Sequence, residues 1–340
     1  MAGIVDVARE AGVSTATVSR ALSGKDYVSI ETKELVQSVA DRLGYVPSAS
    51  AYTLVTGRTK NIGVVVPYVD RWFFATILEA IDRLLVAAGY DVTLYNLSAG
   101  DEHRKSIFTK SLPRKRVDAV LCVSVKMSEE EIAALTKVNK PLVSLGGSVQ
   151  GAKTIRINDQ AAGYLATNHL LSMGHTKIAM IGQSESTDKF YKVFDVRRVG
   201  YEEALKTAGI EPRPGWYRAV SRYSMPEGYA AAKNLLGDPV NAPTAIFASS
   251  DELAVGVLLA AKDLGLNVPA DLSIVGVDNH ELAEFFGITT INQNVVGQGE
   301  LLATTMLELL DNPDQKVPEL TEWPIELIVR SSTAKAPSAQ

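Results

Sequence analysis

The first residues of this chain that could do chemistry are small and polar, with one arginine among them. Thr15, Ala16, Ser19 and Arg20 are spaced so that a helix would present all four on its outer face. Such a face is typical of the second helix of a helix-turn-helix, which lies in the DNA major groove. A plain helical hairpin with a solvated face fits the same spacing. Residues 1–60 carry only one more basic than acidic side chain, so charge alone does not decide between the two interpretations.

A second group of polar and aromatic side chains follows the ends of predicted strands in the body of the chain. Asp278 and Ser250 each follow an apolar run, Arg197 opens a predicted helix, and Trp72 and Phe74 come shortly after the first strand. Ligands of parallel sheets bind beyond the carboxyl ends of the strands. Together these residues predict a site for a polar ligand.

Each of these side chains also has a purely structural interpretation. A carboxylate or hydroxyl just after a strand is often the N-cap of the next helix, and we favour that role for Asp251. Aromatic side chains at the start of a helix are more often part of the core than a platform for a ligand.

Nothing in the sequence indicates catalysis or metal binding. The chain has no G-x-S-x-G, P-loop or H-E-x-x-H motif, and its four histidines are scattered. His169 and His175 frame a predicted helix end, where histidine often bonds terminal carbonyls. The single cysteine, Cys122, lies in an apolar run and is expected to fill space in the core. We therefore expect no catalytic residues, no cofactor and no metal.

Three short helices around a small core are expected to present the first group. Gly12 would end the first helix in a left-handed conformation, Ser14 would cap the second, and the third would begin after Ser29 and stop at Gly44. The inward residues are expected to be Ile4, Val7, Ala8 and Ala11, then Val18, Ala21 and Leu22, then Leu35, Val36, Val39, Ala40 and Leu43.

Beyond residue 60, apolar strands alternate with amphipathic helices, which predicts an α/β body with parallel sheets covered on both faces. About 270 residues of this alternation exceed one doubly wound unit, so two lobes with a cleft between them are expected. The expected strands are 62–66, 92–95, 119–123, 142–145, 154–157, 177–181, 245–248 and 273–277, and the expected helices include 74–88, 161–173, 197–208 and 253–264.

Composition is that of a globular protein, with 46% hydrophobic and 21% charged residues. No apolar run approaches the length needed to span a membrane, and no signal-peptide pattern precedes the first helix. A cytoplasmic location with no membrane partner is the resulting expectation.

Motifs along essentially the whole chain resemble those of the lactose-repressor (LacI/GalR) family of bacterial transcription regulators. Their order and spacing are far more specific than any one of them alone. They are Asp6-Val7-Ala8 through Val18-Ser19-Arg20, Tyr27-Val28-Ser29, Leu43-Gly44-Tyr45-x-Pro47, Ile62–Pro67, Gly174-His175, Arg197-x-x-Gly200-Tyr201, Pro243–Phe247, Leu264-Gly265-Leu266-x-Val268-Pro269, Gly276-Val277-Asp278-Asn279 and Arg330-x-Ser332-Thr333.

The resemblance implies a helix-turn-helix head over residues 1–46, a hinge helix and linker over 47–60, and a two-lobed, periplasmic-binding-protein-like (type I) body over 61–340. It implies that the base-reading positions are Thr15, Ala16 and Arg20, with Thr17 and Ser19 placed at phosphates. Leu54 matches the hinge leucine that wedges into the minor groove and kinks the DNA. Tyr52 replaces an arginine found in many relatives, which removes one positive charge from the hinge.

For the body, the resemblance implies effector contacts at Phe74, Arg197, Tyr223, Ser250 and Asp278, with Asn158 a weaker candidate. Arg197 and Asp278 would bond ligand hydroxyls, while Trp72, Phe74 or Tyr223 would cover an apolar ring face. Gly146 and Gly147 stand where many sugar-responsive relatives have Asp-Arg, which suits a bulkier or differently charged effector. A carbohydrate is nevertheless the expected class.

The expected protein is thus a homodimeric repressor that binds a pseudo-palindromic DNA operator and is controlled allosterically by a small molecule. No assembly beyond the dimer is expected, because the tail after Arg330 has no leucine heptads. One rival is an extracytoplasmic sugar-binding protein, which would carry a signal peptide and no helical head. The other is an enzyme of sugar or nucleotide metabolism, which would turn over a ligand bound between the lobes.

Overall fold

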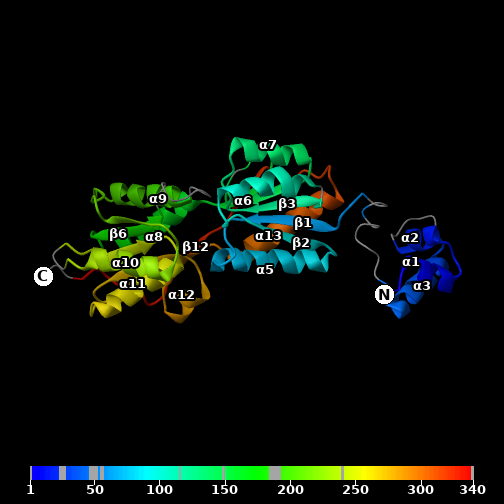
Figure 1. Ribbon diagram of the computed structural model, residues 1–340. Helices are drawn as coiled ribbons and strands as arrows, with labels where there is room; N and C mark the ends of the chain where they lie inside the picture. The colour runs from blue at the N-terminus through cyan, green and yellow to red at the C-terminus, as the bar shows by residue number, and fades with distance from the viewer. Residues whose placement is uncertain are drawn as a thin grey trace.

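The computed structural model places a small helical head beyond one end of a long body made of two α/β lobes (Figure 1). It describes residues 2–22, 28–45, 53, 57–114, 116–147, 149, 151–183, 193–238 and 241–337.

The head consists of α1 (Ile4–Ala11), α2 (Thr15–Leu22) and α3 (Ile30–Leu43) around one apolar cluster. Gly12 ends α1 at φ 67°, where a side chain would strain the backbone, and Ser14 Oγ accepts a hydrogen bond from Thr17 N at 3.1 Å. Ser29 caps α3, as expected. The prediction that Leu35 points inward was wrong. It is 48% exposed, because the buried stripe of α3 runs through Val36, Val39 and Ala40, and Leu35 lies about 100° away from Val36.

Lobe 1 contains a six-stranded sheet, all of whose pairings are parallel, in the order β11-β5-β4-β3-β1-β2. Helices α5 (Trp72–Ala87) and α13 (Val295–Asp311) cover one face, while α6 (Asp101–Ser106), the short turns η1 (Ile107–Ser111) and η2 (Leu112–Arg114), and α7 (Glu129–Val138) cover the other. The strands are β1 (Asn61–Val66), β2 (Asp91–Asn96), β3 (Ala119–Val123), β4 (Leu142–Leu145), β5 (Lys153–Ile157) and β11 (Leu320–Trp323).

Lobe 2 contains a second six-stranded sheet in the order β12-β10-β9-β8-β6-β7, parallel except where β12 runs against β10. Helices α8 (Asp159–Ser172) and α9 (Val193–Thr207) pack on one face, and α10 (Met225–Leu236) and α11 (Asp251–Asp263) on the other. Helix α12 (Glu281–Phe285) follows β9. The strands are β6 (Ile178–Gln183), β7 (Tyr217–Val220), β8 (Ala245–Ala248), β9 (Ser273–Asp278), β10 (Thr289–Asn292) and β12 (Glu326–Ile328).

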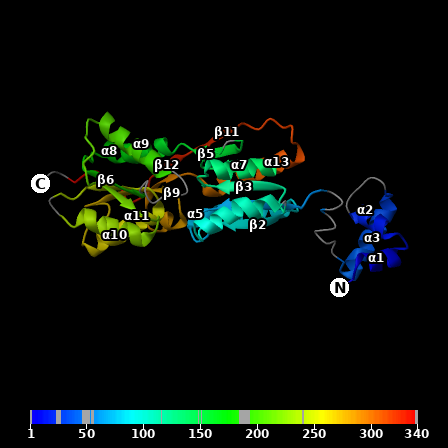
Figure 2. The same ribbon diagram turned by 45° about the horizontal axis from the view of Figure 1, so that its top comes forward.

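The chain passes between the lobes three times. It leaves lobe 1 between β5 and α8, at Asn158, and returns between β10 and α13, at Gln293 and Asn294. The third passage, at Pro324 and Ile325, separates β11 in the first sheet from β12 in the second. Both ribbon views show these segments together at the junction of the lobes (Figure 2). The two doubly wound lobes predicted from the sequence are thereby confirmed.

All eight strands predicted from apolar runs are present, to within a residue or two. Four others, β7, β10, β11 and β12, were not predicted. Within the described part of the chain, no helix is long and apolar enough to cross a bilayer.

Candidate functional site

The outer face of α2 is formed as the spacing predicted. Thr15, Ala16 and Arg20 are exposed, Thr17 and Ser19 are half-buried, and Val18 between them is fully buried in the head core. The Thr17 hydroxyl lies 2.9 Å from Ser14 Oγ, so it also supports the N-cap of α2. Thr15, Ala16 and Arg20 are therefore the most accessible of these side chains.

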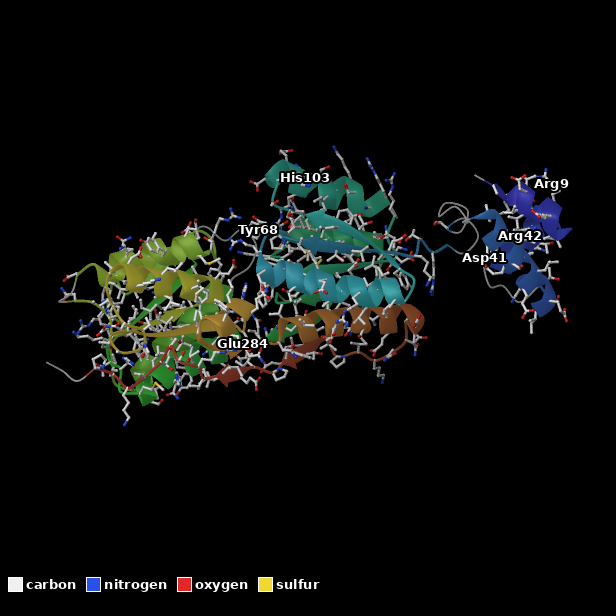
Figure 3. The ribbon with its side chains drawn as sticks, turned by 90° about the horizontal axis from the view of Figure 1, so that it is seen from below. Arg9, Asp41, Arg42, Tyr68, His103 and Glu284 are labelled. Carbon is white, nitrogen blue, oxygen red and sulfur yellow. The ribbon has the colours of Figure 1, made fainter. Side chains whose placement is uncertain are left out.

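Two ion pairs neutralise much of the remaining charge of the head. Arg9 bonds Asp6 at 2.8 Å, and Arg42 of α3 bonds Glu10 of α1 at 2.7 Å (Figure 3). Arg20 is the sole basic residue of α2, so it is the side chain of that helix able to bond a base edge at two points. The hinge candidate Leu54 and its neighbour Tyr52 lie outside the described residues.

In the body, Arg197 is held in place by a close crossing of α8 and α9. A Cβ added to Gly163 would lie 2.0 Å from the carbonyl oxygen of Arg197, and a Cβ on Gly200 would lie 2.0 Å from that of Gln160. The two glycines therefore allow the helix backbones to approach closely. Arg197, 5% exposed, donates through Nε to Asp159 at 2.9 Å and through Nη1 to the carbonyl of Ser249 at 2.6 Å.

Asp278 ends β9 beside this arginine and bonds the side-chain amide of Gln293. Burial raises the pKa of Asp278 to about 7, although the positive charge of Arg197 acts in the opposite direction. Burial also raises the pKa of Asp159, again against Arg197. For Arg197, burial lowers the pKa, but Asp159, Tyr223 and Asp278 together raise it above its usual value.

Tyr223 is close enough to Arg197 and Asp278 to interact with their charges, and burial raises the pKa of its hydroxyl well above the usual value. The structure thus brings together three of the predicted effector residues, Arg197, Tyr223 and Asp278. Carboxyl groups at this site outnumber arginines, since Asp159 and Asp278 are joined by Asp251. Such a group offers acceptor oxygens together with donors from Arg197 and from carboxyls that keep a proton, which suits a ligand with several polar groups.

The aromatic candidates approach from lobe 1. The Phe74 ring packs edge-on against Phe73 at 5.2 Å and lies 6.1 Å from the Tyr68 ring. Trp72 instead reaches across to lobe 2, where its ring centre lies 4.3 Å from that of His280. Trp72 is therefore in contact with the opposite lobe, and Phe74 belongs to an aromatic cluster at the end of β1.

Two predicted contacts are occupied by helix caps. Ser250 Oγ caps α11 by accepting from Leu253 N at 3.3 Å, and Asn158 Oδ1 caps α8 by accepting from Ala161 N at 3.0 Å. The favoured role of Asp251 as N-cap was wrong, because Ser250 takes that position. Asp251 instead turns inward and accepts from His280 N at 2.8 Å, and burial beside Asp278 raises its pKa well above the usual value.

Residues that sequence reasoning did not select also bridge the lobes. Arg222 of lobe 2 bonds Asp70 of lobe 1 at 3.2 Å and lies 5.8 Å from the ring of Tyr68, which Figure 3 shows at the junction. Arg71 approaches Glu252 at 4.0 Å. Asp159 and Gln293 were missed because each lies at a crossing between the lobes, and no compositional signal in the sequence marks these crossings.

Gly146, which follows β4, has φ 88°, a conformation that suits glycine. Two of the four histidines have structural partners: His175 bonds Thr244 and Ser273 at 2.9 and 3.0 Å, and His169 lies 3.0 Å from Thr333 Oγ1. Among the described residues, no cluster of His, Cys, Asp or Glu side chains could hold a metal ion.

A helix-turn-helix head joined to two lobes with buried polar groups at their junction defines a ligand-regulated DNA-binding protein. Residues 3–48 match the family model "Bacterial regulatory proteins, lacI family", and residues 167–333 match "Periplasmic binding protein-like domain". The chain is 33% identical to the HTH-type transcriptional repressor PurR of Glaesserella parasuis serovar 5 (strain SH0165), over 98% of both chains. The chain belongs to the LacI family and is a DNA-binding transcriptional repressor rather than an enzyme.

Solved structures agree with this assignment. The lac repressor dimer bound to operator and the anti-inducer ONPF superposes with a TM-score of 0.83 at 25% identity, covering 98% of this chain and 99% of that one. The complex of the transcriptional regulator CelR with cellobiose gives a TM-score of 0.70 at 27% identity, covering 98% and 100%.

Proposed function

We propose that this repressor acts as a homodimer in the cytoplasm, where chromosomal DNA is found. An effector bound between its lobes controls its affinity for a pseudo-palindromic operator. The head (1–46) binds DNA in a sequence-specific way, the hinge and linker (47–60) add contacts to the DNA, and the body (61–340) binds the effector and dimerises. In the head, Thr15, Ala16 and Arg20 read bases, Thr17 and Ser19 bond phosphates, and Leu54 enters the minor groove.

The observation that carries the effector site is the group formed by the buried Arg197 and the partly exposed Asp278 and Tyr223. A polyol can donate hydroxyl protons to Asp278 and accept from Arg197, while Tyr223 and Phe74 cover the less polar face of its ring. A carbohydrate is therefore the effector class we propose, with Trp72, Asn158 and Ser250 contributing from the rim. The relative bound to cellobiose supports the same class.

A thermal-shift screen of sugars, sugar phosphates and purines tests this class. A ligand present at about 100 times its Kd adds about 2.7 kcal/mol to the free energy of unfolding and so raises Tm. A sugar should raise the Tm of the wild-type protein and not that of Asp278→Asn. A rise with purines alone would overturn the carbohydrate assignment while leaving the repressor intact.

A DNA retention assay tests the regulatory role itself. The purified protein should retain one palindromic duplex from a random library, and the ligand found in the screen should change that retention. Reciprocity requires the duplex to change the affinity for the ligand by the same factor, ordinarily about 5- to 150-fold. Turnover of the ligand would contradict a purely regulatory role.

Dimerisation is supported by exposed apolar side chains along one side of both lobes. Helices α5, α11 and α12 lie along this side in Figure 1. They carry Val86, Leu259 and Phe285, which are 56%, 41% and 82% exposed, and the edge strand β2 adds Leu94 at 45%. A second copy of the chain would cover this surface.

A further inference from the structure

The linker that leads from the head into lobe 1 is anchored by one buried carboxylate. Asp118, 4% exposed, accepts hydrogen bonds from Thr59 N and Lys60 N, both at 2.8 Å, and from Thr59 Oγ1 at 3.0 Å. The Lys60 ammonium lies 4.0 Å from the centre of the Tyr90 ring. These contacts fix the direction in which the chain leaves the body toward the head.

The residue just before this anchor is attached to a different element. Arg58 Nη2 donates to the carbonyl oxygen of Leu310 at 3.3 Å. Leu310 lies in the last turn of α13, where carbonyls have no partner within the helix and the helix dipole favours a cation. The linker is thus bonded to the C-terminal end of α13.

The opposite end of the same helix is bonded to the candidate effector site. Gln298, 2% exposed and in the first turns of α13, donates through Nε2 to the Gln293 carbonyl at 2.6 Å and lies 3.2 Å from Gln293 Oε1. The Gln293 amide in turn bonds Asp278. Gln293 itself lies at the second crossing between the lobes, so this chain of amides joins lobe 2 to α13.

Helix α13 is well suited to act as a rigid connection between its two ends. Its 17 residues span about 25 Å, and Figures 1 and 2 show it running from the lobe junction toward the end of lobe 1 where the linker enters. It packs tightly along α5, since a Cβ on Gly299 would lie 2.8 Å from Ala80 Cβ. Bending within such a packed helix is unfavourable, so a shift at one end moves the other.

We propose that α13 couples the effector site to the DNA-binding linker, with Gln298 as the positioning residue that acts on Asp278 through Gln293 and Arg58 as the positioning residue at the linker. An effector that displaces Asp278 or changes the lobe angle pulls on Gln293 and Gln298, shifts α13 along α5, and moves Leu310 and Arg58 against the fixed point at Asp118. This proposal rests on the proposed function and adds the route by which its two sites communicate.

Hydrogen exchange in the full-length protein, without any effector, tests the route. The Thr59 and Lys60 amides report on the anchor because both donate to Asp118. Gln298→Leu should speed exchange of the peptide covering residues 57–62 about fivefold or more, the lower end of ordinary couplings. The control Gln160→Leu changes an exposed helical glutamine of α8 and should leave that peptide unchanged. Unchanged exchange in Gln298→Leu, with Gln293 and its neighbours exchanging faster, would overturn the proposal.

A double-mutant cycle on DNA affinity separates coupling from simple loss of stability. The probe is the palindromic duplex that the wild-type protein enriches from a random library. Gln298→Leu and Arg58→Met should each change its Kd about fivefold or more, and the double variant should match the single ones. Arg58→Lys should restore near-wild-type affinity, because it keeps a donor for the Leu310 carbonyl.

Additive effects in the cycle would refute the coupling. Failure of the wild-type protein to enrich any duplex would instead refute the proposed function, and the exchange experiment would still decide the route on its own.

Discussion

At the scale of single residues, environment changes what each side chain can do. Asp278 and Asp251 are both aspartates at the carboxyl edge of the same sheet, but their partners differ. Asp278 meets Arg197 and Gln293, whereas Asp251 bonds the backbone of His280. The first is thereby placed to bind a ligand and the second holds β9 to α11. The sequence placed both at the carboxyl edge correctly but could not separate these roles, because they depend on contacts made through another element.

Replacing Asp278 with asparagine should remove a pH dependence of folding. The native carboxyl keeps its proton up to about pH 7, whereas an unfolded aspartate releases it near about pH 4. Between these values the native state binds more protons, so stability falls as pH rises and the loss is complete above pH 7. Relative to Asp278→Asn, the wild type should lose about 1–4 kcal/mol of unfolding free energy from pH 4 to 8.

Urea unfolding of both proteins across this range measures the effect. The neighbouring groups Arg197, Asp159, Asp251 and Glu252 are present in both, so their own titration largely cancels in the difference. If the unfolding free energies of the two proteins changed with pH in parallel, the pKa of Asp278 would be the same in the native and unfolded states, and the prediction would be wrong.

Replacing Arg20 with alanine should weaken operator binding by about 1–3 kcal/mol and relax the preference at one base pair. The reason is the loss of a bidentate contact to guanine, which no other side chain of α2 can supply. Binding titrations on the operator and on single-base variants measure it, with Arg9→Ala, an exposed arginine paired to Asp6, as the control. An equal loss on operator and random DNA would assign Arg20 to the phosphates.

At the scale of elements, the strands that could be predicted were the buried ones. Strand β3 is buried at every position and reads as an unbroken apolar run. Strand β11 alternates exposed and half-buried residues over only four positions, and β7 exposes two of four, so neither differs from a loop in composition. Helix positions were likewise predictable only where burial is clear. Leu35 was wrongly expected to be buried together with its neighbour Val36, because the buried stripe of α3 is narrow.

Gly163→Ala should destabilise lobe 2 by about 1–3 kcal/mol or more, because its Cβ would overlap the Arg197 carbonyl. Urea unfolding measures the loss, and the displaced arginine should also reduce the thermal shift caused by the effector. Gly3→Ala is the control, because that Cβ would meet only Asp6 Oδ2, at 3.8 Å. Wild-type stability in Gly163→Ala would mean that α8 and α9 can separate without cost.

At the scale of the whole molecule, the sequence predicted two α/β lobes but not the points at which the chain crosses between them. The alternation of strands and helices indicated two lobes, but the crossings at Asn158, Gln293 and Pro324 carry no compositional signal. Nor did the sequence reveal that Asp70 and Arg222, 152 positions apart, form an ion pair across the junction. Such pairs depend on the relative placement of two complete sheets.

Phe285→Asp should convert the dimer into a monomer, because it places a charge at the centre of the exposed apolar side of the molecule. Sedimentation should then give the mass of one chain, 36.5 kDa, instead of twice that value. Val199→Asp is the matched control, since Val199 is 49% exposed on α9, on the other side of the molecule. A wild-type protein that sediments as a monomer would contradict the homodimer.

The three crossings also set the order in which the protein can mature on the ribosome. Lobe 2 takes all but one of its strands from the continuous stretch between α8 and β10, but lobe 1 waits for α13 and β11. The lobe 1 core includes Leu302, Met306 and Leu310 of that late helix, so a nascent chain ending near residue 294 exposes an apolar sheet face. Because Arg58 of the linker bonds the same helix, this second attachment of the linker forms only when synthesis is nearly finished. A truncated product would therefore compete poorly with the complete repressor for the operator.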